Sequence, residues 1–284
     1  MRIEDQNNPR LGQARRSQSK SKISSRDCMQ AYLGEFVGTA LLILLGNGVV
    51  ANVLLAKTKG NGAGWIVITF GWGMAVFVAV WCVTEISHAH INPAVTIGLS
   101  LAGEFDSTLA LGYIAAQMLG AIVGAALVFL FYRDHYVASS DADAKLGTFA
   151  TSPAIRNYPI NLFSEVVGTF VLVFATLLAV DPALSTSTEA EAPMADGETK
   201  IGLGALGALP AGLLVLAIGL SLGGTTGYAI NPARDLGPRI AHALLPIPGK
   251  RDSDWAYAWV PVVGPILGAV VAVLLWWALT RPVQ

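Results

Sequence analysis

Long apolar runs without a charged residue are the feature that most restricts how this chain can fold. Five runs lack Asp, Glu, Lys and Arg altogether, and a sixth, Asn161–Val180, contains only Glu165. A helix of about 20 apolar residues crosses the ~30 Å hydrocarbon core of a bilayer, so each run is long enough to span it. An all-α membrane protein with six transmembrane helices is therefore predicted. The five uncharged runs are Phe36–Ala56, Gly60–Thr84, Ser107–Tyr132, Ile201–Ala233 and Trp255–Thr280.

The composition argues against several other classes of protein. Only 13% of the residues are charged and 54% are hydrophobic, whereas soluble domains carry about 25% charged residues. The formal net charge is −1 and no basic block lies in the apolar body, so we expect no nucleic-acid partner. Cys28 and Cys82 are too few for a disulfide scaffold or a multi-cysteine zinc site. We expect neither a metal nor a cofactor, and no nucleophile–base pair points to an enzyme.

The polar ends of the chain predict its orientation. Lys and Arg outnumber Asp and Glu in the first 28 residues, and such an excess beside a first span predicts a cytoplasmic N-terminus. Six spans return the C-terminus to the same side, and we expect a cytoplasmic (plasma) membrane. An organelle transit peptide is the alternative, but Glu4 and Asp5 argue against it. The polar, acidic stretch Asp181–Lys200 is interpreted as a solvated connector rather than a partner-binding segment.

An internal repeat organises the spans into two halves. Glu35-Phe-Val-Gly-Thr recurs as Glu165-Val-Val-Gly-Thr, and Asn92-Pro-Ala recurs as Asn231-Pro-Ala. A third repeated motif is Gln117-Met-Leu-Gly-Ala, which recurs as Pro265-Ile-Leu-Gly-Ala. Each half then has three spans with a short Asn-Pro-Ala segment between the second and third. An odd number of spans gives the two halves opposite orientations, so this is an inverted repeat, which places a site near the midplane.

The two Asn-Pro-Ala segments predict half-helices that enter the membrane and stop. Asn is a strong N-cap and Pro is favoured at the first helical position, so helices should begin at Asn92 and Asn231. Each segment is too short to cross, and irregular backbone at membrane depth is tolerated only against protein or a water-filled cavity. Entering from opposite faces, the helices would direct their positive N-terminal ends toward a central lumen. A simple turn is the alternative for one copy.

His90-Ile-Asn-Pro-Ala-Val-Thr and Asn231-Pro-Ala-Arg-Asp are the signatures of a known family. Over about residues 31–280 the sequence resembles the aquaporin and glycerol-facilitator superfamily. The resemblance implies a six-helix right-handed bundle with two re-entrant half-helices, one pore per subunit, and a homotetramer. It also implies a domain division: a polar tail at 1–30, a channel domain at 31–280 and a C-terminal tail at 281–284. Within the channel domain, repeat one covers about 31–133 and repeat two about 161–280, joined by the 134–160 loop.

The resemblance also predicts the residues of a selectivity constriction. Arg234, a lone cation in a long uncharged stretch, is placed at the narrow extracellular end of the pore. The other constriction positions fall on Phe70, Gly219 and Tyr228, with Trp72 weighed as a less favoured wall residue. Gly219 leaves open a space that histidine narrows in strict water channels, and an aromatic corner beside an arginine suits an alkyl polyol. Asp235, with Arg239 four residues later, is a marker of the glycerol-conducting branch.

Other positions are assigned by the same resemblance. Asn92 and Asn231 are expected to donate hydrogen bonds at the pore centre. Glu35, Glu165 and His90 are expected to brace the re-entrant loops, a role preferred over proton relay. His88 occupies a position where the family often has glycine and is strained there if φ is positive. Backbone carbonyls are expected to line the path at His88, Ala89, His90, Gly227, Tyr228 and Ala229.

The predicted function is a passive channel for glycerol and similar small uncharged solutes, with some water, that excludes ions and protons. Lipid bilayer and small neutral solutes are its expected partners. A water-selective aquaporin is the close alternative. A secondary active transporter is a second alternative, but it would need charged coupling residues, and only Glu35 and Glu165 qualify. Three less favoured roles remain for the polar residues: a salt bridge from Arg234 to Asp235, a metal at Glu85, His88 and His90, and pH sensing by His88.

Overall fold

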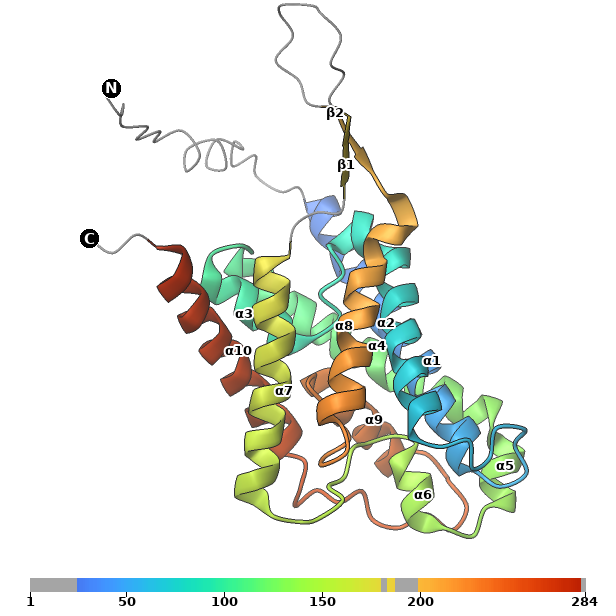
Figure 1. Cartoon of the computed structure of the whole chain (residues 1–284). Helices are drawn as coiled ribbons and strands as arrows, with labels where there is room; N and C mark the ends of the chain where they lie inside the picture. The colour runs from blue at the N-terminus through green and yellow to red at the C-terminus, as the bar shows by residue number, and fades with distance from the viewer. Residues whose placement is uncertain (1–24, 180–182, 187–198, 282–284) are drawn as a thin grey trace, which may run out of the picture.

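Six helical segments of the described residues are long and apolar enough to cross a membrane, as the uncharged runs predict. The computed structural model describes residues 25–179, 183–186 and 199–281 (Figure 1). Its elements are, in order, α1 (Ser25–Leu54), α2 (Trp65–Ser87), α3 (Pro93–Ala102), α4 (Ser107–Phe131), α5 (Arg133–Ala138), α6 (Ala142–Gly147), α7 (Tyr158–Leu178), β1 (Ala183–Thr186), β2 (Thr199–Gly202), the 3₁₀ helix η1 (Gly204–Ala208), α8 (Leu209–Leu222), α9 (Pro232–Leu244) and α10 (Val260–Thr280).

The inverted repeat is visible in how the helices pack. In the first half α1 packs against α2 and α4, and in the second half α7 packs against α8 and α10. The half-helices cross between the halves, since α3 packs against α10 and α9 packs against α4. Each half-helix is therefore held by a spanning helix of the other repeat, which brings the two Asn-Pro-Ala segments together inside the bundle.

Equivalent glycines allow the close helix crossing in each half. A Cβ atom at Gly120 of α4 would lie 2.3 Å from the carbonyl oxygen of Phe36 in α1. A Cβ atom at Gly268 of α10 would lie 2.4 Å from the carbonyl oxygen of Val166 in α7. Small residues let helix backbones approach in membranes, where apolar burial alone gives no preference for helix over lipid. The third repeated motif thus marks a close helix crossing in each half.

The connections between the spans contain more structure than the sequence analysis expects. The 134–160 loop holds the short helices α5 and α6. In the stretch interpreted as a solvated connector, Asp181–Lys200, Ala183–Thr186 pairs in antiparallel fashion with Thr199–Gly202, which extends two residues past the stretch, and this hairpin lies between α7 and α8 in the chain. This hairpin is a small exception to the all-α prediction. The remainder of that stretch, the N-terminal residues 1–24 and residues 282–284 lie outside the described part of the chain.

The two ends of the bundle differ in what they carry. Figure 1 shows the start of α1, the end of α10 and the β1–β2 hairpin at one end, and α5 and α6 at the opposite end. The first and last spans thus begin and end on the same side, as an even number of crossings requires. Large apolar side chains such as Leu111 and Phe131 are exposed on the outer faces of the helices, where a bilayer would cover them.

Candidate pore and constriction

The half-helices begin at the two asparagines. Asn92 caps α3, its Oδ1 accepting from the Ala94 amide at 2.9 Å, and Asn231 caps α9, its Oδ1 accepting from the Ala233 amide at 3.0 Å. Both asparagines have extended backbone and are followed by proline at the first helical position. This is the capping arrangement that the Asn-Pro pairs predict.

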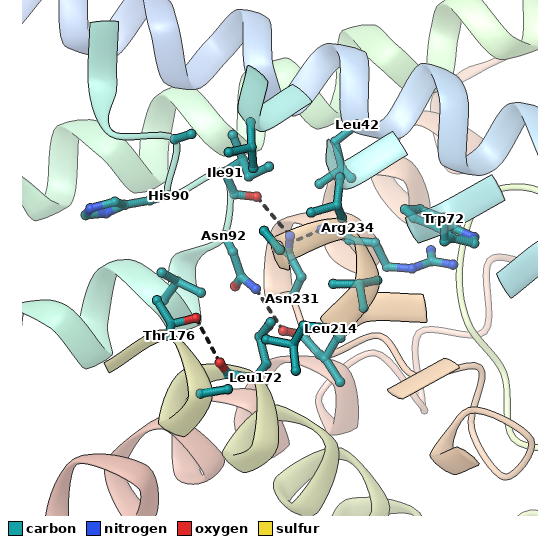
Figure 2. Close-up of a pocket in the computed structure, with 18 of the residues that line it drawn as sticks. Leu42, Trp72, His90, Ile91, Asn92, Leu172, Thr176, Leu214, Asn231 and Arg234 are labelled. Atoms are coloured by element: carbon teal, nitrogen blue, oxygen red, sulfur yellow. Dashed lines mark hydrogen bonds between the residues drawn. The ribbon is translucent and has the colours of Figure 1, made fainter. Parts of the chain in front are cut away.

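Each asparagine also holds the loop of the opposite repeat. The Asn92 Nδ2 donates to the Ile230 carbonyl at 2.9 Å, and the Asn231 Nδ2 donates to the Ile91 carbonyl at 2.9 Å (Figure 2). The two helix N-termini therefore meet in a reciprocal pair of hydrogen bonds. Since an amide nitrogen carries two donors, each Nδ2 retains a second N–H beyond the one that this pairing uses.

The loops that precede the asparagines adopt the same strained backbone in both halves. Positive φ occurs four, three and one residues before each asparagine. Residues other than glycine rarely adopt positive φ, so these loops store strain that surrounding contacts must hold. The positions are His88 (61°), Ala89 (51°) and Ile91 (43°) in the first half, and Gly227 (82°), Tyr228 (37°) and Ile230 (43°) in the second.

A buried glutamate accepts the backbone N–H groups of each strained loop. Glu35 of α1 accepts from the amides of His90 at 2.9 Å and Ile91 at 2.6 Å. Glu165 of α7 accepts from the amides of Ala229 at 3.0 Å and Ile230 at 2.8 Å. An ionised carboxylate can accept only, and it is a stronger acceptor than a neutral group. The glutamates thus occupy equivalent places and satisfy donors that would otherwise be unpaired in the membrane.

Side chains that the sequence analysis did not assign complete these two acceptor sites. Ser87 Oγ donates to Glu35 at 2.7 Å and Thr226 Oγ1 donates to Glu165 at 2.7 Å, each from five residues before its asparagine. Gln117 Nε2 adds a further bond to Glu35 at 2.6 Å. Ser87 and Thr226 both stand five positions before an Asn-Pro-Ala motif, and this shared spacing is a sequence signal from which their common role could be predicted. The His90 ring contacts the Thr96 hydroxyl at 3.1 Å and points away from the two asparagines in Figure 2.

A continuous cavity of about 450 Å³ runs past the paired asparagines. At one end it is lined by residues where α7 ends and α8 begins, including Thr176 and Pro210. At the other end it reaches Trp72, Tyr228 and Arg234. Most of its wall is apolar, with polar groups grouped along the two re-entrant loops. Of the six predicted path positions, His88, Ala89, His90, Tyr228 and Ala229 line this cavity, and Gly227 does not.

Arg234 lies at the end of the cavity opposite Thr176 and Pro210, where its guanidinium rests on an aromatic ring. Its Cζ is 4.2 Å from the centre of the Trp72 ring, and its Nη1 donates to the Phe149 carbonyl at 3.4 Å. The side chain is only 6% exposed, so the charge is stabilised by the ring face and by the carbonyl dipole. The adjacent Asp235 carboxylate forms no ion pair with Arg234 in the described structure and binds Arg239 instead.

The prediction that Phe70 forms the aromatic wall is wrong. Phe70 is 55% exposed and lies on the outer face of α2, beside Val49 and Ile66. Trp72 is 4% exposed and lines the cavity. Two residues along an α-helix are separated by about 200° around its axis, so these side chains face opposite directions. Trp72, the less favoured position in the sequence analysis, is therefore the α2 residue that lines the cavity beside Arg234.

The space beside Gly219 is occupied by Tyr228. A Cβ atom at Gly219 would lie 2.8 Å from Cζ and 2.9 Å from the hydroxyl oxygen of Tyr228. The Trp65 ring packs edge-to-face on Tyr228 at 5.8 Å, and its Nε1 donates to the Gly219 carbonyl at 3.1 Å. The absence of a side chain at Gly219 thus makes room for the tyrosine ring. The sequence analysis expects an open space at this position, whereas the structure fills it with Tyr228.

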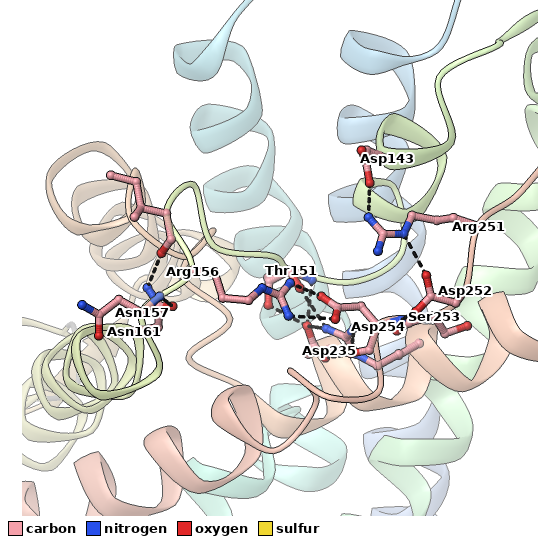
Figure 3. Close-up of polar contacts among 12 residues, drawn as sticks. Asp143, Thr151, Arg156, Asn157, Asn161, Asp235, Arg251, Asp252, Ser253 and Asp254 are labelled. Atoms are coloured by element: carbon pink, nitrogen blue, oxygen red, sulfur yellow. Dashed lines mark hydrogen bonds and ion pairs between the residues drawn. The ribbon is translucent and has the colours of Figure 1, made fainter.

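A buried ion pair ties α9 to the surrounding loops at the end that carries α5 and α6. Arg239 Nε donates to Asp235 at 2.8 Å, and both side chains are fully buried. Asp235 also accepts from the Thr151 amide at 2.7 Å, and Arg239 donates to the Ser253 carbonyl at 2.7 Å. Figure 3 shows this cluster beside the Arg156–Asp254 pair. On the nearby surface the Arg251 guanidinium holds the pKa of the Asp252 carboxyl below its usual value.

Comparison with known proteins identifies this arrangement. A family profile described as major intrinsic protein matches residues 22–276. The chain belongs to the major intrinsic protein family. The "Probable glycerol uptake facilitator protein" of Thermotoga maritima is 54% identical to this family member over 248 residues, which cover 87% of this chain and 98% of that protein. The glycerol uptake facilitator protein of Bacillus subtilis is 52% identical over 240 residues, covering 84% of this chain and 81% of that one.

Solved structures agree with the assignment to this family. The aquaglyceroporin from Plasmodium falciparum matches with a TM-score of 0.72 at 31% identity, covering 88% of this chain and 95% of that chain. The chain is thus a multi-pass membrane protein with the aquaporin-like fold: six spanning helices, two re-entrant half-helices and an inverted 3+3 repeat.

Proposed function

We propose that this major intrinsic protein is a passive channel for glycerol and similar small uncharged solutes, with some water. The observation that carries the proposal is the continuous cavity that leads past Asn92 and Asn231 to Arg234 on Trp72. The relatives named as glycerol uptake facilitators, at 52–54% identity, and the matching aquaglyceroporin support this solute class. Membership of the family makes the protein a membrane transporter and not an enzyme.

The chemistry of the cavity suits a solute with one apolar and one polar side. Arg234 and the remaining N–H groups of Asn92 and Asn231 can donate to hydroxyl oxygens along one wall. The rings of Trp72 and Tyr228 offer an apolar surface to the carbon chain. A polyol can then exchange water for protein hydrogen bonds step by step, so that it is never fully desolvated without replacement partners. The loop carbonyls from His88 to His90 and from Gly227 to Ala229 are the proposed acceptors on this path.

Ions and protons are opposed by the same groups. The N-termini of α3 and α9 meet at the asparagines, and each helix N-terminus carries a partial positive charge of about half a unit. Arg234 adds a full positive charge at the constriction. No ring of carboxylates faces the cavity among the described residues that line it, so a cation gains no replacement for its hydration shell.

A water-selective channel is the second candidate function. It is favoured by one observation: the Tyr228 hydroxyl lies beside Gly219, where an open wall would admit a wider solute. Against it stands Trp72, which supplies the aromatic surface that water does not need. The solute ranking is therefore the first property to measure.

Assembly and membrane topology complete the proposal. We expect a homotetramer in the cytoplasmic (plasma) membrane, with the N- and C-termini in the cytoplasm. The placement of the start of α1 and the end of α10 at one end of the bundle supports a shared side for the two termini. The excess of Lys and Arg before the first span supports the cytoplasm as that side.

Proteoliposomes in a stopped-flow light-scattering instrument test the function directly. Vesicles with the protein receive either an impermeant osmolyte or a glycerol gradient, and empty vesicles serve as the baseline. Fast re-swelling in glycerol is the expected result. Rapid water shrinkage without glycerol re-swelling would contradict the proposal and favour the water-selective alternative.

A matched pair of variants tests which aromatic residue forms the wall. Trp72→Ala removes the ring beneath Arg234, whereas Phe70→Ala removes a ring of the same helix that faces outward. We expect Trp72→Ala to change the ratio of glycerol to water permeability and Phe70→Ala to leave it at the parent value. If instead Phe70→Ala changed this ratio and Trp72→Ala did not, Phe70 and not Trp72 would form the aromatic wall.

A further inference from the structure

Asn47 is a fully buried amide in the last third of the first spanning helix, α1. Neither the sequence motifs nor the predicted pore residues include it. A polar side chain inside a membrane span is costly unless it finds partners, so it is a candidate for a role in function. Its Nδ2 donates across the bundle to the Phe149 carbonyl at 3.2 Å, a contact between residues 102 positions apart.

The Phe149 carbonyl is also the acceptor for the guanidinium of Arg234. Arg234 Nη1 donates to it at 3.4 Å, and within the described structure this is the hydrogen bond that the guanidinium makes. One carbonyl oxygen with two lone pairs thus receives a neutral amide from α1 and a cation from α9. Phe149 itself lies in the segment after α6 and is fully buried, with its ring edge-to-face on His242 at 5.3 Å.

The residue before Asn47 shapes the other surface on which Arg234 rests. A Cβ atom at Gly46 would lie 2.3–2.5 Å from three carbons of the Trp72 ring, so the glycine is what admits that ring. The same ring carries the Arg234 guanidinium at 4.2 Å. Two consecutive residues of α1 therefore determine where both contacts of the guanidinium, the indole face and the carbonyl, are located.

We propose that Asn47 is a positioning residue of the constriction, which holds the Phe149 carbonyl oxygen where Arg234 donates to it. Without the Asn47 amide, the segment at Phe149 loses its tie to α1, and the guanidinium loses a fixed acceptor. Arg234 then samples positions in which it meets the hydroxyl groups of a polyol less well. Water, which is smaller and needs no particular alignment, is affected less. This inference rests on the proposed function.

The test compares Asn47→Leu and Asn47→Ala with a control in the same helix. Leu has the branched shape and the number of heavy atoms of Asn but is bulkier and has no polar group, and Ala removes the amide without overfilling the site. The control is Thr39→Val, which removes another fully buried polar group of α1, one whose hydroxyl has no hydrogen-bond partner among the described residues. Glycerol and water permeabilities are measured in proteoliposomes at equal protein content, with the apparent unfolding temperature in detergent as a measure of folding.

We expect the Asn47 variants to lower the glycerol-to-water permeability ratio by about threefold to tenfold, the range that corresponds to one lost hydrogen bond. Thr39→Val should keep the parent ratio. A purely structural role of Asn47 would lower the unfolding temperature and leave this ratio unchanged, which would overturn the proposal. So would an equal change in Thr39→Val, or failure of both Asn47 variants to fold. If the parent conducts no glycerol, the proposed function fails instead, which is a separate result.

Discussion

At the scale of single residues, the pore depends on side chains that are absent as much as on those present. Gly219 has no side chain where the Tyr228 ring lies, and Gly46 has none where the Trp72 ring lies. Both aromatic rings of the constriction are therefore seated against a glycine of a neighbouring helix. We therefore expect the width of the passage to depend on both members of each pair.

A side chain at Gly219 should push Tyr228 toward the pore. We expect Gly219→His to reduce glycerol permeability by about tenfold or more while water permeability is largely kept, because even a Cβ atom would lie 2.8 Å from Tyr228. Stopped-flow re-swelling measures both rates. Gly224→His is the control, since a Cβ atom there meets nothing within 4 Å. Full glycerol permeability in Gly219→His would contradict this placement of the wall.

Replacing His88 by glycine measures how much the strained backbone at this position destabilises the protein. It has φ of 61°, and the equivalent position four residues before Asn231 is Gly227, with φ of 82°. The left-handed region costs a residue with a Cβ atom about 1–2 kcal/mol. We therefore expect His88→Gly to raise the apparent unfolding temperature of the purified channel. A lower unfolding temperature would mean that contacts of the exposed imidazole stabilise the protein more than the strain destabilises it.

At the scale of elements, each re-entrant loop is a strained segment held by one carboxylate of a spanning helix. The two halves repeat this device down to the positions of the donors, which are one, two and five residues before the asparagine. An inverted repeat accounts for this equivalence, because two equivalent loops enter the membrane from opposite faces. The half-helices are thereby held at membrane depth by bonds from outside their own segment.

Neutralising one of these carboxylates should loosen its loop. Glu165→Gln replaces one acceptor oxygen by an NH₂ group and leaves a backbone N–H of Ala229 or Ile230 without a partner. An unsatisfied buried donor costs about 1–3 kcal/mol, so the unfolding temperature and the glycerol permeability should both fall. Glu85→Gln, at an exposed site near the end of α2, is the control and should behave like the parent. If Glu165→Gln had the unfolding temperature of the parent, Glu165 would not be needed to brace the loop.

At the scale of the whole molecule, polar contacts hold the segment that connects the two halves against the second half, at the end of the bundle that carries α5 and α6. The Asp235–Arg239 pair joins α9 to the segment at Thr151 and to that at Ser253 and Asp254. The hydrogen-bonded residues are up to 88 positions apart in the sequence, the separation of Arg239 and Thr151. Because the pair is fully buried and its remaining donors and acceptors are used, its parts are interdependent.

Breaking that pair should destabilise the whole bundle. Asp235→Ala leaves the buried Arg239 cation uncompensated, and we expect a loss of about 3–5 kcal/mol in the free energy of unfolding. The control is Asp143→Ala, which removes the exposed partner of Arg251 and should cost at most about 1 kcal/mol. Denaturation followed by tryptophan fluorescence measures both. Equal effects of the two changes would contradict the importance of the buried pair.

The spans, the half-helices and the repeat could be predicted from the sequence because their signals are local. Apolar length sets a membrane crossing, and the Asn-Pro pairs cap α3 and α9 as expected. The prediction at α2 failed by two residues, since a continuously apolar helix shows no polar face from which its rotation could be derived. Phe70 and Trp72 are both large aromatic residues, and the packing of Trp72 against Gly46 and Arg234 distinguishes them.

Composition and short motifs were thus enough to predict the elements, their order, the membrane environment and the family resemblance. The position of Trp72 beneath Arg234, of Tyr228 beside Gly219 and of Asn47 at the Phe149 carbonyl could be seen only in the folded chain. These contacts join segments that are brought together by the packing of different helices. Their geometry is set by helix rotation and close packing, which no local pattern of residues encodes.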